Sequence, residues 1–213
     1  MEGFYTVNGE FSYTIVIEKS KFICYLKGIE SEDDAKEFIN SIKKMNSLAT
    51  HNCYAYIADD KGLIMKFSDD GEPQGTAGLP MLEVLKNKKI YKAVAVVTRY
   101  FGGIKLGTGG LTRAYSGAVS SCLDISKISN MQLGKKLAIK CDYENYSSLL
   151  RLFNIPLVSV LNTEFDNNIN ITIVCRQDYF ITLKNQLSDL FKGKENIKEI
   201  SSGYYSFGEL CQK

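Results

Sequence analysis

Two glycine-rich segments have the residue types and spacing of loops that line a ligand-binding site. The first reads DGEPQGTAG from Asp70 to Gly78, and the second reads GGIKLGTGG from Gly102 to Gly110. Glycine permits positive φ and lets backbone N–H groups approach a ligand closely. A buried strand is expected between the segments, so we predict that both line one functional site; the alternative is a set of tight turns at strand ends. The residues assigned to the lining of this site are Gly75, Thr76, Gly102, Gly103, Gly107, Gly109 and Gly110.

Basic residues surround the second segment although the whole chain is nearly neutral. Lys and Arg number 26 against 24 Asp and Glu, so the net charge does not indicate a nucleic-acid binder. From Lys86 to Arg113, however, there are seven basic residues and no acidic one. We predict that Arg99, Lys105 and Arg113 bind an anion, with Arg113 in the first turn of a helix that starts just after Gly110. A cation is disfavoured at a helix N-terminus unless an anion is bound there, and phosphate is the obvious candidate.

Aromatic residues accompany these cations. Tyr100, Phe101 and Tyr115 provide faces on which exposed bases stack. For Phe101 and Tyr115 the alternative is a place in the core. Neither glycine segment matches a P-loop or a GxGxxG fingerprint, so nucleotide hydrolysis by a P-loop is not predicted.

Acidic residues next to the first segment support the same site. Asp69, Asp70 and Glu72 would hold Mg²⁺ through carboxylate oxygens, or else form a capped turn and pair with Arg99 or Arg113. His51 is a candidate general base, but a single histidine more often has a structural role. We assign no metal and no cofactor, because one histidine and six cysteines without a CxxC pair do not make a classical zinc site.

The composition is that of an ordinary globular protein. Hydrophobic residues make up 45% of the chain and charged residues 23%. The first residues, MEGFYTVNGE, lack the basic and apolar regions of a secretory signal, and the apolar runs are too short or interrupted to span a bilayer. We therefore expect a soluble, cytoplasmic protein with reduced cysteines and no membrane partner.

The first part of the chain is predicted to contain a sheet with helices. Ser31 caps a helix whose apolar residues recur at helical spacing, and further helices are expected over Pro80–Lys86 and after Gly110. Short alternating or continuous apolar runs predict strands over Tyr13–Glu18, Phe22–Lys27, Cys53–Ala58, Leu63–Phe67 and Ala93–Thr98.

The second part follows a different pattern. After about Asn130 glycine becomes rare, and the elements read strand, helix, strand, strand, helix, strand, which is typical of a ferredoxin-like domain. The domains are therefore placed at residues 1–130 and 135–208, with a linker near Ser129–Lys135. The predicted elements are Lys136–Asp142, Glu144–Phe153, Leu157–Phe165, Ile169–Arg176, Asp178–Phe191 and Ile197–Tyr205.

Three motifs resemble the signatures of the IMPACT family (UPF0029), specifically its bacterial YigZ-type members. They are ATHNCYAY (Ala49–Tyr56), SDDGEPQGTAGLPML (Ser68–Leu82) and VTRYFGGIKLGTGGLTRAYS (Val97–Ser116). The resemblance implies an α+β protein with a ribosomal protein S5 domain 2-like N-terminal domain and a ferredoxin-like C-terminal domain similar to elongation factor G domain V. Eukaryotic relatives regulate translation but carry an additional N-terminal RWD domain.

Together these observations predict a non-catalytic protein that binds RNA or the ribosome and takes part in translation regulation. Phosphate charge would be neutralised by Arg99, Lys105 and Arg113, with little reading of bases. One alternative is a Mg²⁺-dependent enzyme acting on a phosphorylated small molecule or nucleotide in the same groove. Another is a protein–protein adaptor that uses the sheet of the second domain.

Overall fold

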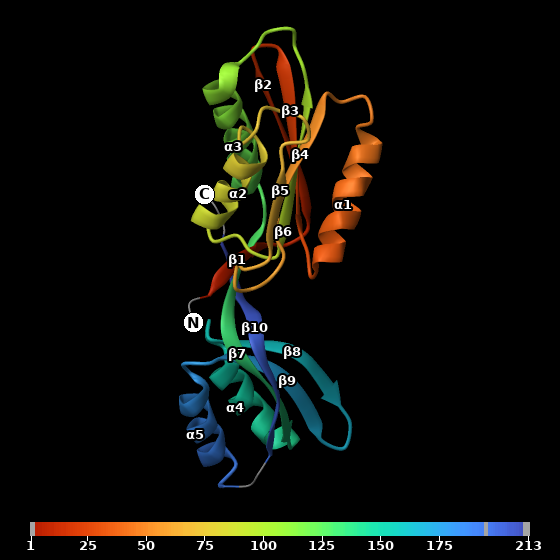
Figure 1. Ribbon diagram of the computed structural model, residues 1–213. Coiled ribbons are helices and arrows are strands. Elements are labelled where there is room, and N and C mark those ends of the chain that lie inside the picture. The colour runs from red at the N-terminus through yellow and green to blue at the C-terminus, as the bar shows by residue number, and fades with distance from the viewer. Residues whose placement is uncertain (1–2, 194–195, 211–213) are drawn as a thin grey trace. The chain divides into compact units, whose positions relative to one another are not determined.

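The computed structural model describes residues 3–193 and 196–210. Its contacts divide the chain into two compact units, which we call the first unit (Phe4–Ser129) and the second unit (Asn130–Glu209). Each unit combines helices with a β-sheet, so the chain belongs to the predicted α+β class (Figure 1). In the described ranges, no helix combines the length and apolar character needed to cross a membrane.

The first unit is built on a five-stranded antiparallel sheet. Its central strand carries the run AVAVVTR, which is buried throughout as expected for a strand covered on both faces. A hairpin between two of its strands turns through Glu18 and Lys19, whose φ values of 45° and 62° are those of a tight hairpin turn. In sheet order the strands are β2 (Glu10–Ile17), β3 (Ser20–Gly28), β6 (Ala93–Tyr100), β4 (His51–Ile57) and β5 (Met65–Ser68).

Helices cover both faces of this sheet (Figure 1). On one face lies α1 (Glu32–Met45), which begins with the predicted Ser31 cap: the N–H of Asp34 donates to Ser31 Oγ, and the Asp34 carboxylate accepts from the Ser31 N–H. On the other face lie α2 (Gly78–Asn87) and α3 (Gly107–Asp124), which share a buried core with β3, β4 and β6. These packed helices fix the segments before α2 and α3, where both glycine clusters lie.

Helix α3 begins earlier than predicted, at Gly107 rather than after Gly110. The buried residues Leu111, Ala114 and Tyr115 anchor its first turns, and this packing outweighs the low helix propensity of glycine. Arg113 therefore lies in the second turn, and its predicted place in the first turn was wrong.

The short strand β1 (Phe4–Val7) was not predicted. Its residue Tyr5 donates a backbone hydrogen bond to Lys89 O and accepts one from the Tyr91 N–H. Four residues with no strong alternation give little signal in the sequence.

The second unit shows the predicted strand–helix order. Helices α4 (Tyr143–Phe153) and α5 (Phe180–Leu190) pack on one face of the sheet, around Leu149, Leu183 and Leu187. In its sheet, β7 (Ile128–Cys141) pairs with β9 (Ile169–Arg176), and β8 (Val158–Phe165) lies beyond β9. Strand β7 also pairs with β10 (Ile197–Leu210) and with β1.

The division between the two units falls within residues 129–135, which were placed as a linker, and these residues form part of β7. Gly134 pairs with Arg176 and Lys135 with Cys175 in the β7–β9 register. A Cβ on Gly134 would lie 3.0 Å from the Phe207 ring, so glycine here admits a close aromatic contact rather than breaking a strand.

Candidate functional site

Both glycine clusters lie at the same end of the first unit's sheet. In the register of the central strands His51, where β4 begins, is opposite Arg99, near the end of β6. The last residue of β5, Ser68, is opposite Tyr54 at this same end. We call this region, residues 69–78 with residues 101–110, the glycine-loop end. The predicted convergence of the two segments therefore follows from the antiparallel register.

Arg99 is buried here and paired within the unit. Its Nη1 donates to Glu72 Oε1 at 2.6 Å, and the hydroxyl of Tyr115 donates to the same oxygen at 2.7 Å. Only 7% of the Arg99 side chain and 3% of the Glu72 side chain are exposed. The guanidinium carbon also lies 5.4 Å from the ring centres of both Phe22 and Phe101. An internal carboxylate thus neutralises Arg99, so its predicted role as a direct anion contact needs the pair to open.

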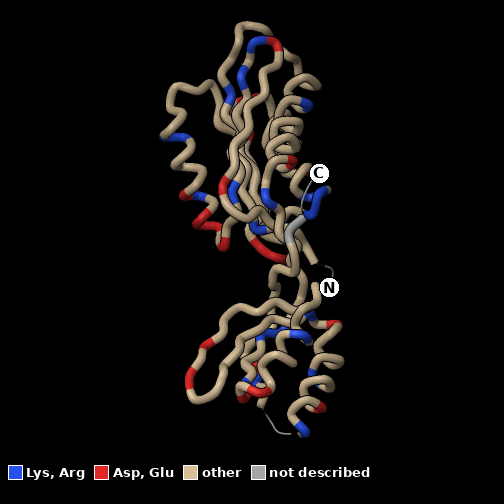
Figure 2. The backbone as a smooth tube through the Cα atoms, turned by 180° about the vertical axis from the view of Figure 1, so that it is seen from behind, with Lys and Arg blue, Asp and Glu red and all other residues tan. Residues whose placement is uncertain are grey.

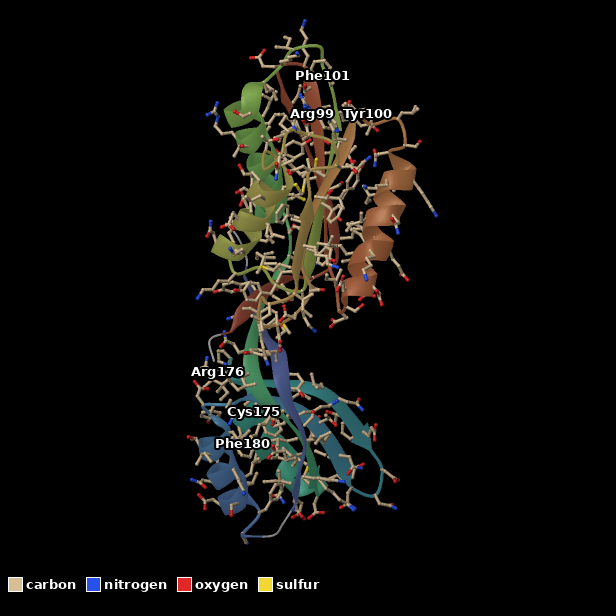
Figure 3. All side chains as sticks on the ribbon, viewed as in Figure 1. Arg99, Tyr100, Phe101, Cys175, Arg176 and Phe180 are labelled. Atoms are coloured by element: carbon tan, nitrogen blue, oxygen red, sulfur yellow. The ribbon has the colours of Figure 1, made fainter. Side chains whose placement is uncertain are left out.

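Figure 3 shows Arg99, Tyr100 and Phe101 in succession where β6 leaves the sheet. The three differ in how much their side chains are buried and hydrogen-bonded within the protein. Tyr100 donates its hydroxyl to Asn46 Oδ1 at 3.0 Å, whereas the Phe101 side chain is 47% exposed. Of the aromatic residues predicted to stack on bases, Phe101 is available, while Tyr115 is fully buried.

The acidic segment forms a capped turn. Asp69 accepts hydrogen bonds from the N–H groups of Gly75, Ala77 and Gly78 at 2.8–3.0 Å, which secures the start of α2. Glycine suits position 75 because φ is +75° there. Thr76 donates its hydroxyl to Pro73 O at 2.6 Å and stabilises the same turn.

Asp70 links this turn to two other elements. One of its carboxylate oxygens accepts from Lys43 Nζ at 2.6 Å, and the other accepts from the N–H of Asn52 at 2.7 Å. Its backbone carbonyl lies 2.9 Å from His51 Nδ1, which must carry a proton in order to donate to it. The other ring nitrogen, Nε2, lies 3.9 Å from Glu72 Oε2.

These contacts weigh against metal or nucleophile chemistry. The three carboxylates predicted as Mg²⁺ ligands already accept hydrogen bonds from amides, a lysine, an arginine and a tyrosine. Within the described ranges, no cluster of three or more His, Cys, Asp and Glu side chains is arranged to hold a metal ion. Burial raises the pKa of the neighbouring Cys53 thiol to about 12 and also raises the pKa of Tyr115, so both groups stay protonated at neutral pH.

Lys105 and Arg113 differ from Arg99 in being exposed. Neither has an ion pair or hydrogen bond from its side chain to any residue that the structure describes. A Cβ on Gly109 would lie 3.9 Å from Arg113 Nη1, so the guanidinium reaches back over the first turn of α3. No side chain caps that turn, and the first turn contains no acidic residue. Positive charge therefore accumulates at the start of α3 without internal compensation.

The loop before α3 depends on its glycines for shape. Gly103 and Gly107 have φ values of +87° and +69°, which favour glycine. A Cβ on Gly102 would lie 2.0 Å from the carbonyl carbon of Lys19, so only glycine fits against the β2–β3 hairpin. Gly110 is less constrained, since a Cβ there would meet Leu106 Cβ at 3.0 Å.

This close approach brings in cations that the sequence analysis missed. Lys19 and Lys21 of the hairpin are exposed, and their ammonium groups have no partner in the part of the chain that the structure describes. Lys21 is opposite Tyr100 in the β3–β6 register. The available signal was the short interval between two predicted strands at residues 18–22, which places a hairpin turn at this end of the sheet.

Opposite charges gather at the other end of the first unit. Figure 2 shows acidic segments where α1 begins, at Glu32, Asp33 and Asp34. The hairpin turn at the glycine-loop end carries one further carboxylate, that of exposed Glu18 beside Lys19.

Comparison with known proteins places this geometry in a family. Residues 18–123 match the model described as the Impact N-terminal domain, a range that includes the whole glycine-loop end. The "IMPACT family member YvyE" of Bacillus subtilis (strain 168) is 39% identical over 93% of this chain and 92% of its own length. The "IMPACT family member YigZ" of Escherichia coli (strain K12) is 32% identical, covering 83% and 88%.

A solved structure is similar over nearly the full length. It is a crystal structure of a hypothetical protein, with a TM-score of 0.61, 29% sequence identity and coverage of 94% of this chain and 98% of that chain. Both units therefore have counterparts in one known structure.

Proposed function

This chain belongs to the IMPACT family, and from that premise we propose that it is a non-catalytic protein that binds RNA, on the ribosome, in the regulation of translation. The observation that carries the proposal is the pair Lys105 and Arg113, two exposed cations near the uncapped start of α3 that have no side-chain partner among the described residues. Lysine and arginine that neutralise phosphates supply most sequence-independent affinity for nucleic acid. The role in translation is the one that the family resemblance implies.

The glycine-loop end suits the RNA backbone better than a base-reading pocket. Cations from the β2–β3 hairpin, the Gly102–Leu106 loop and α3 occupy neighbouring elements, so several phosphates of one strand are within their reach. Exposed Phe101 offers a face for one unpaired base. Arg99, held by Glu72, orients Phe101 by stacking beneath its ring.

The finer description of the two units is part of the proposal. The first unit corresponds to the ribosomal protein S5 domain 2-like domain placed at residues 1–130. The second corresponds to the ferredoxin-like, elongation factor G domain V-like domain placed at residues 135–208; its sheet order β10-β7-β9-β8 and its two helices on one face support that description. A cytoplasmic location belongs with a ribosomal partner.

Retention of RNA by purified protein tests the proposal. Lys105→Glu with Arg113→Glu should abolish copurification of RNA from cell extract, because two phosphate contacts become repulsive. The matched control is Lys61→Glu with Lys127→Glu, which reverses two other exposed lysines of the first unit that lack side-chain partners among the described residues. The control should retain RNA, and ribonuclease should remove the retained material.

The result that contradicts the proposal is RNA retention by the Lys105 and Arg113 variant at the level of the unaltered chain. Loss of RNA retention in both variants would also contradict it, since the site would then contribute no more to RNA binding than other exposed lysines. Circular dichroism and urea unfolding check that each variant is folded, which we expect because the substituted side chains are exposed.

The enzymatic alternative predicts a different response. A Mg²⁺ site at Asp69, Asp70 and Glu72 requires the amide, lysine and arginine contacts of these carboxylates to be replaced. It therefore predicts a thermal shift on adding Mg²⁺ that is lost in Asp70→Asn. Our proposal predicts no such metal-dependent shift.

A further inference from the structure

The second unit contains a hollow on the face of its sheet that no helix covers. Along β7, Leu137 and Ile139 face the helices and lie in the core, so Ala138 and Lys140 face the opposite side. The same alternation on β9 places Asn170 and Thr172 on that opposite side. The hollow has a volume of about 260 Å³ and is lined on this face by Ala138, Lys140, Asn170, Thr172, Asn196 and Lys198.

The polar side chains of this hollow do not hydrogen-bond or pair with other described residues. Over residues 3–193 and 196–210, the side chains of Lys140, Lys198, Asn170, Thr172 and Asn196 make no hydrogen bond or ion pair. Among the residues that the structure describes, no carboxylate lines the hollow. The closest in register is Glu164, opposite Asn170 on β8, and it accepts a hydrogen bond from Asn162 Nδ2 at 2.9 Å.

Other cations of the same unit have acidic partners. Lys135 pairs with Glu199 at 2.5 Å and lies 4.6 Å from the centre of the Phe180 ring. Arg176, close to the labelled Cys175 and Phe180 in Figure 3, forms a bidentate pair with Asp178. Unpaired lysines on the open face therefore do not reflect a general shortage of acidic partners in this unit.

We propose that this open-face hollow binds the phosphodiester backbone of single-stranded RNA. Lys140 and Lys198 neutralise phosphate, and the Asn170, Thr172 and Asn196 side chains hydrogen-bond to phosphate oxygens and ribose hydroxyls. None of the described lining residues is aromatic, so they offer no ring on which the base of a free nucleotide could stack.

A third cation extends the surface along β7. Lys136 lies on the same face as Lys140, four residues away or roughly 13 Å along the strand, and has no side-chain partner in the described part of the chain. A row of this length suits a continuous strand rather than a single phosphate group. The site is separate in sequence and in unit from the glycine-loop end.

Salt-dependent binding of a fluorescein-labelled oligo(U) RNA to the full chain tests the proposal. Lys140→Ala with Lys198→Ala should weaken binding and reduce the slope of log K against log salt by roughly 1.4, at about 0.7 per phosphate contact on a single strand. The control is Lys184→Ala with Lys192→Ala, two exposed lysines in or directly after α5. It should leave the slope unchanged.

Several outcomes would overturn the inference. They are an unchanged slope in the Lys140 and Lys198 variant, an equal reduction in the control, or no binding of oligo(U) by the unaltered chain. Saturable binding of uridine monophosphate that depends on Lys140 would assign the hollow to a free nucleotide and contradict the commitment to RNA.

The same titration separates this inference from the proposal for the first unit. Lys140→Ala and Lys198→Ala are introduced again into a chain carrying Lys105→Ala and Arg113→Ala. If the first-unit proposal alone fails, Lys105→Ala and Arg113→Ala change nothing, while the loss caused by the open-face variants persists. If the open-face inference alone fails, the reverse pattern is measured.

Discussion

The two ends of the first unit's sheet differ in how several of their cations are paired. At the end where α1 begins, Lys92 pairs with Glu30 at 2.7 Å and Lys66 with Glu32 at 2.6 Å. At the glycine-loop end, Lys105 and Arg113 are exposed and have no such partner among the described residues. Both ends carry many charges, and the glycine-loop end places unpaired cations beside the uncapped start of a helix.

This difference separates two uses of charge. A pair that is satisfied within the protein holds elements together, as Lys66 and Glu32 join β5 to α1. An unpaired cation over a helix start costs electrostatic energy in the free protein and recovers it only when an anion binds. Arg99 stands between the two classes, because it lies at the glycine-loop end yet is paired to Glu72.

The largest effect is expected from breaking that buried pair. Glu72→Gln removes the carboxylate charge beside Arg99 and leaves a buried guanidinium uncompensated, which should lower the free energy of unfolding by about 3–5 kcal/mol. Urea unfolding followed by circular dichroism measures the loss. A matched control is Glu83→Gln, which breaks an exposed pair with Lys86 and should cost less than about 1 kcal/mol.

A loss below 1 kcal/mol in Glu72→Gln would show that Arg99 does not depend on Glu72. Arg99 would then belong with the free cations, and the contrast between structural and ligand-binding charge at this end would fail.

The next effect concerns the shape of the glycine loop. Gly102→Ala places a methyl group against the Lys19 backbone, and the displacement should cost roughly 1–3 kcal/mol of unfolding free energy and weaken RNA binding. Gly117→Ala is the control, because a Cβ in this part of α3 meets nothing within 4 Å. It should stabilise the protein by about 0.5–1 kcal/mol and leave RNA binding unchanged. Equal behaviour of the two variants would refute the close approach as the reason for Gly102.

The smallest effect is expected at the opposite end of the first unit, in the pH dependence of the free energy of unfolding. Hydrogen bonds from Lys66 and Tyr56 lower the pKa of Glu32 from 4.5 to about 2. The folded-state pKa is depressed, so the contribution of Glu32 to stability is present above pH 4.5 and is lost as the pH falls toward 2. The free energy of unfolding should therefore fall less steeply over this range in Glu32→Gln than in the unaltered chain. Parallel pH profiles would contradict the pairing.

Much of the fold could be predicted from local pattern. The cap at Ser31, the buried run Ala93–Thr98 and the strand–helix order of the second unit all follow from periodicity and side-chain chemistry, and the structure confirms them. Ser129–Lys135, placed between the two domains, is part of strand β7, because a strand can continue through Gly134 when an aromatic ring packs over it. That contact comes from Phe207, far away in the sequence.

The site was predictable in location but only partly in electrostatics. Charge counting along the chain found Lys105 and Arg113, and the capped-turn alternative for residues 69–72 already included a pairing with Arg99. Which alternative holds depends on spatial contacts, since Glu72 and Tyr115 meet Arg99 only after β6, α3 and the turn have packed. Lys19 was missed for the same reason: its proximity to Gly102 arises from tertiary packing.

Titration of oligo(U) RNA at increasing salt with Lys105→Ala and Arg113→Ala tests the central claim most directly. Loss of two phosphate contacts should reduce the slope of log K against log salt by roughly 1.4 and leave the free energy of unfolding within about 0.5 kcal/mol of the unaltered chain. An identical slope, with the protein folded and binding RNA as before, would show that uncompensated charge at the glycine-loop end does not bind the RNA backbone.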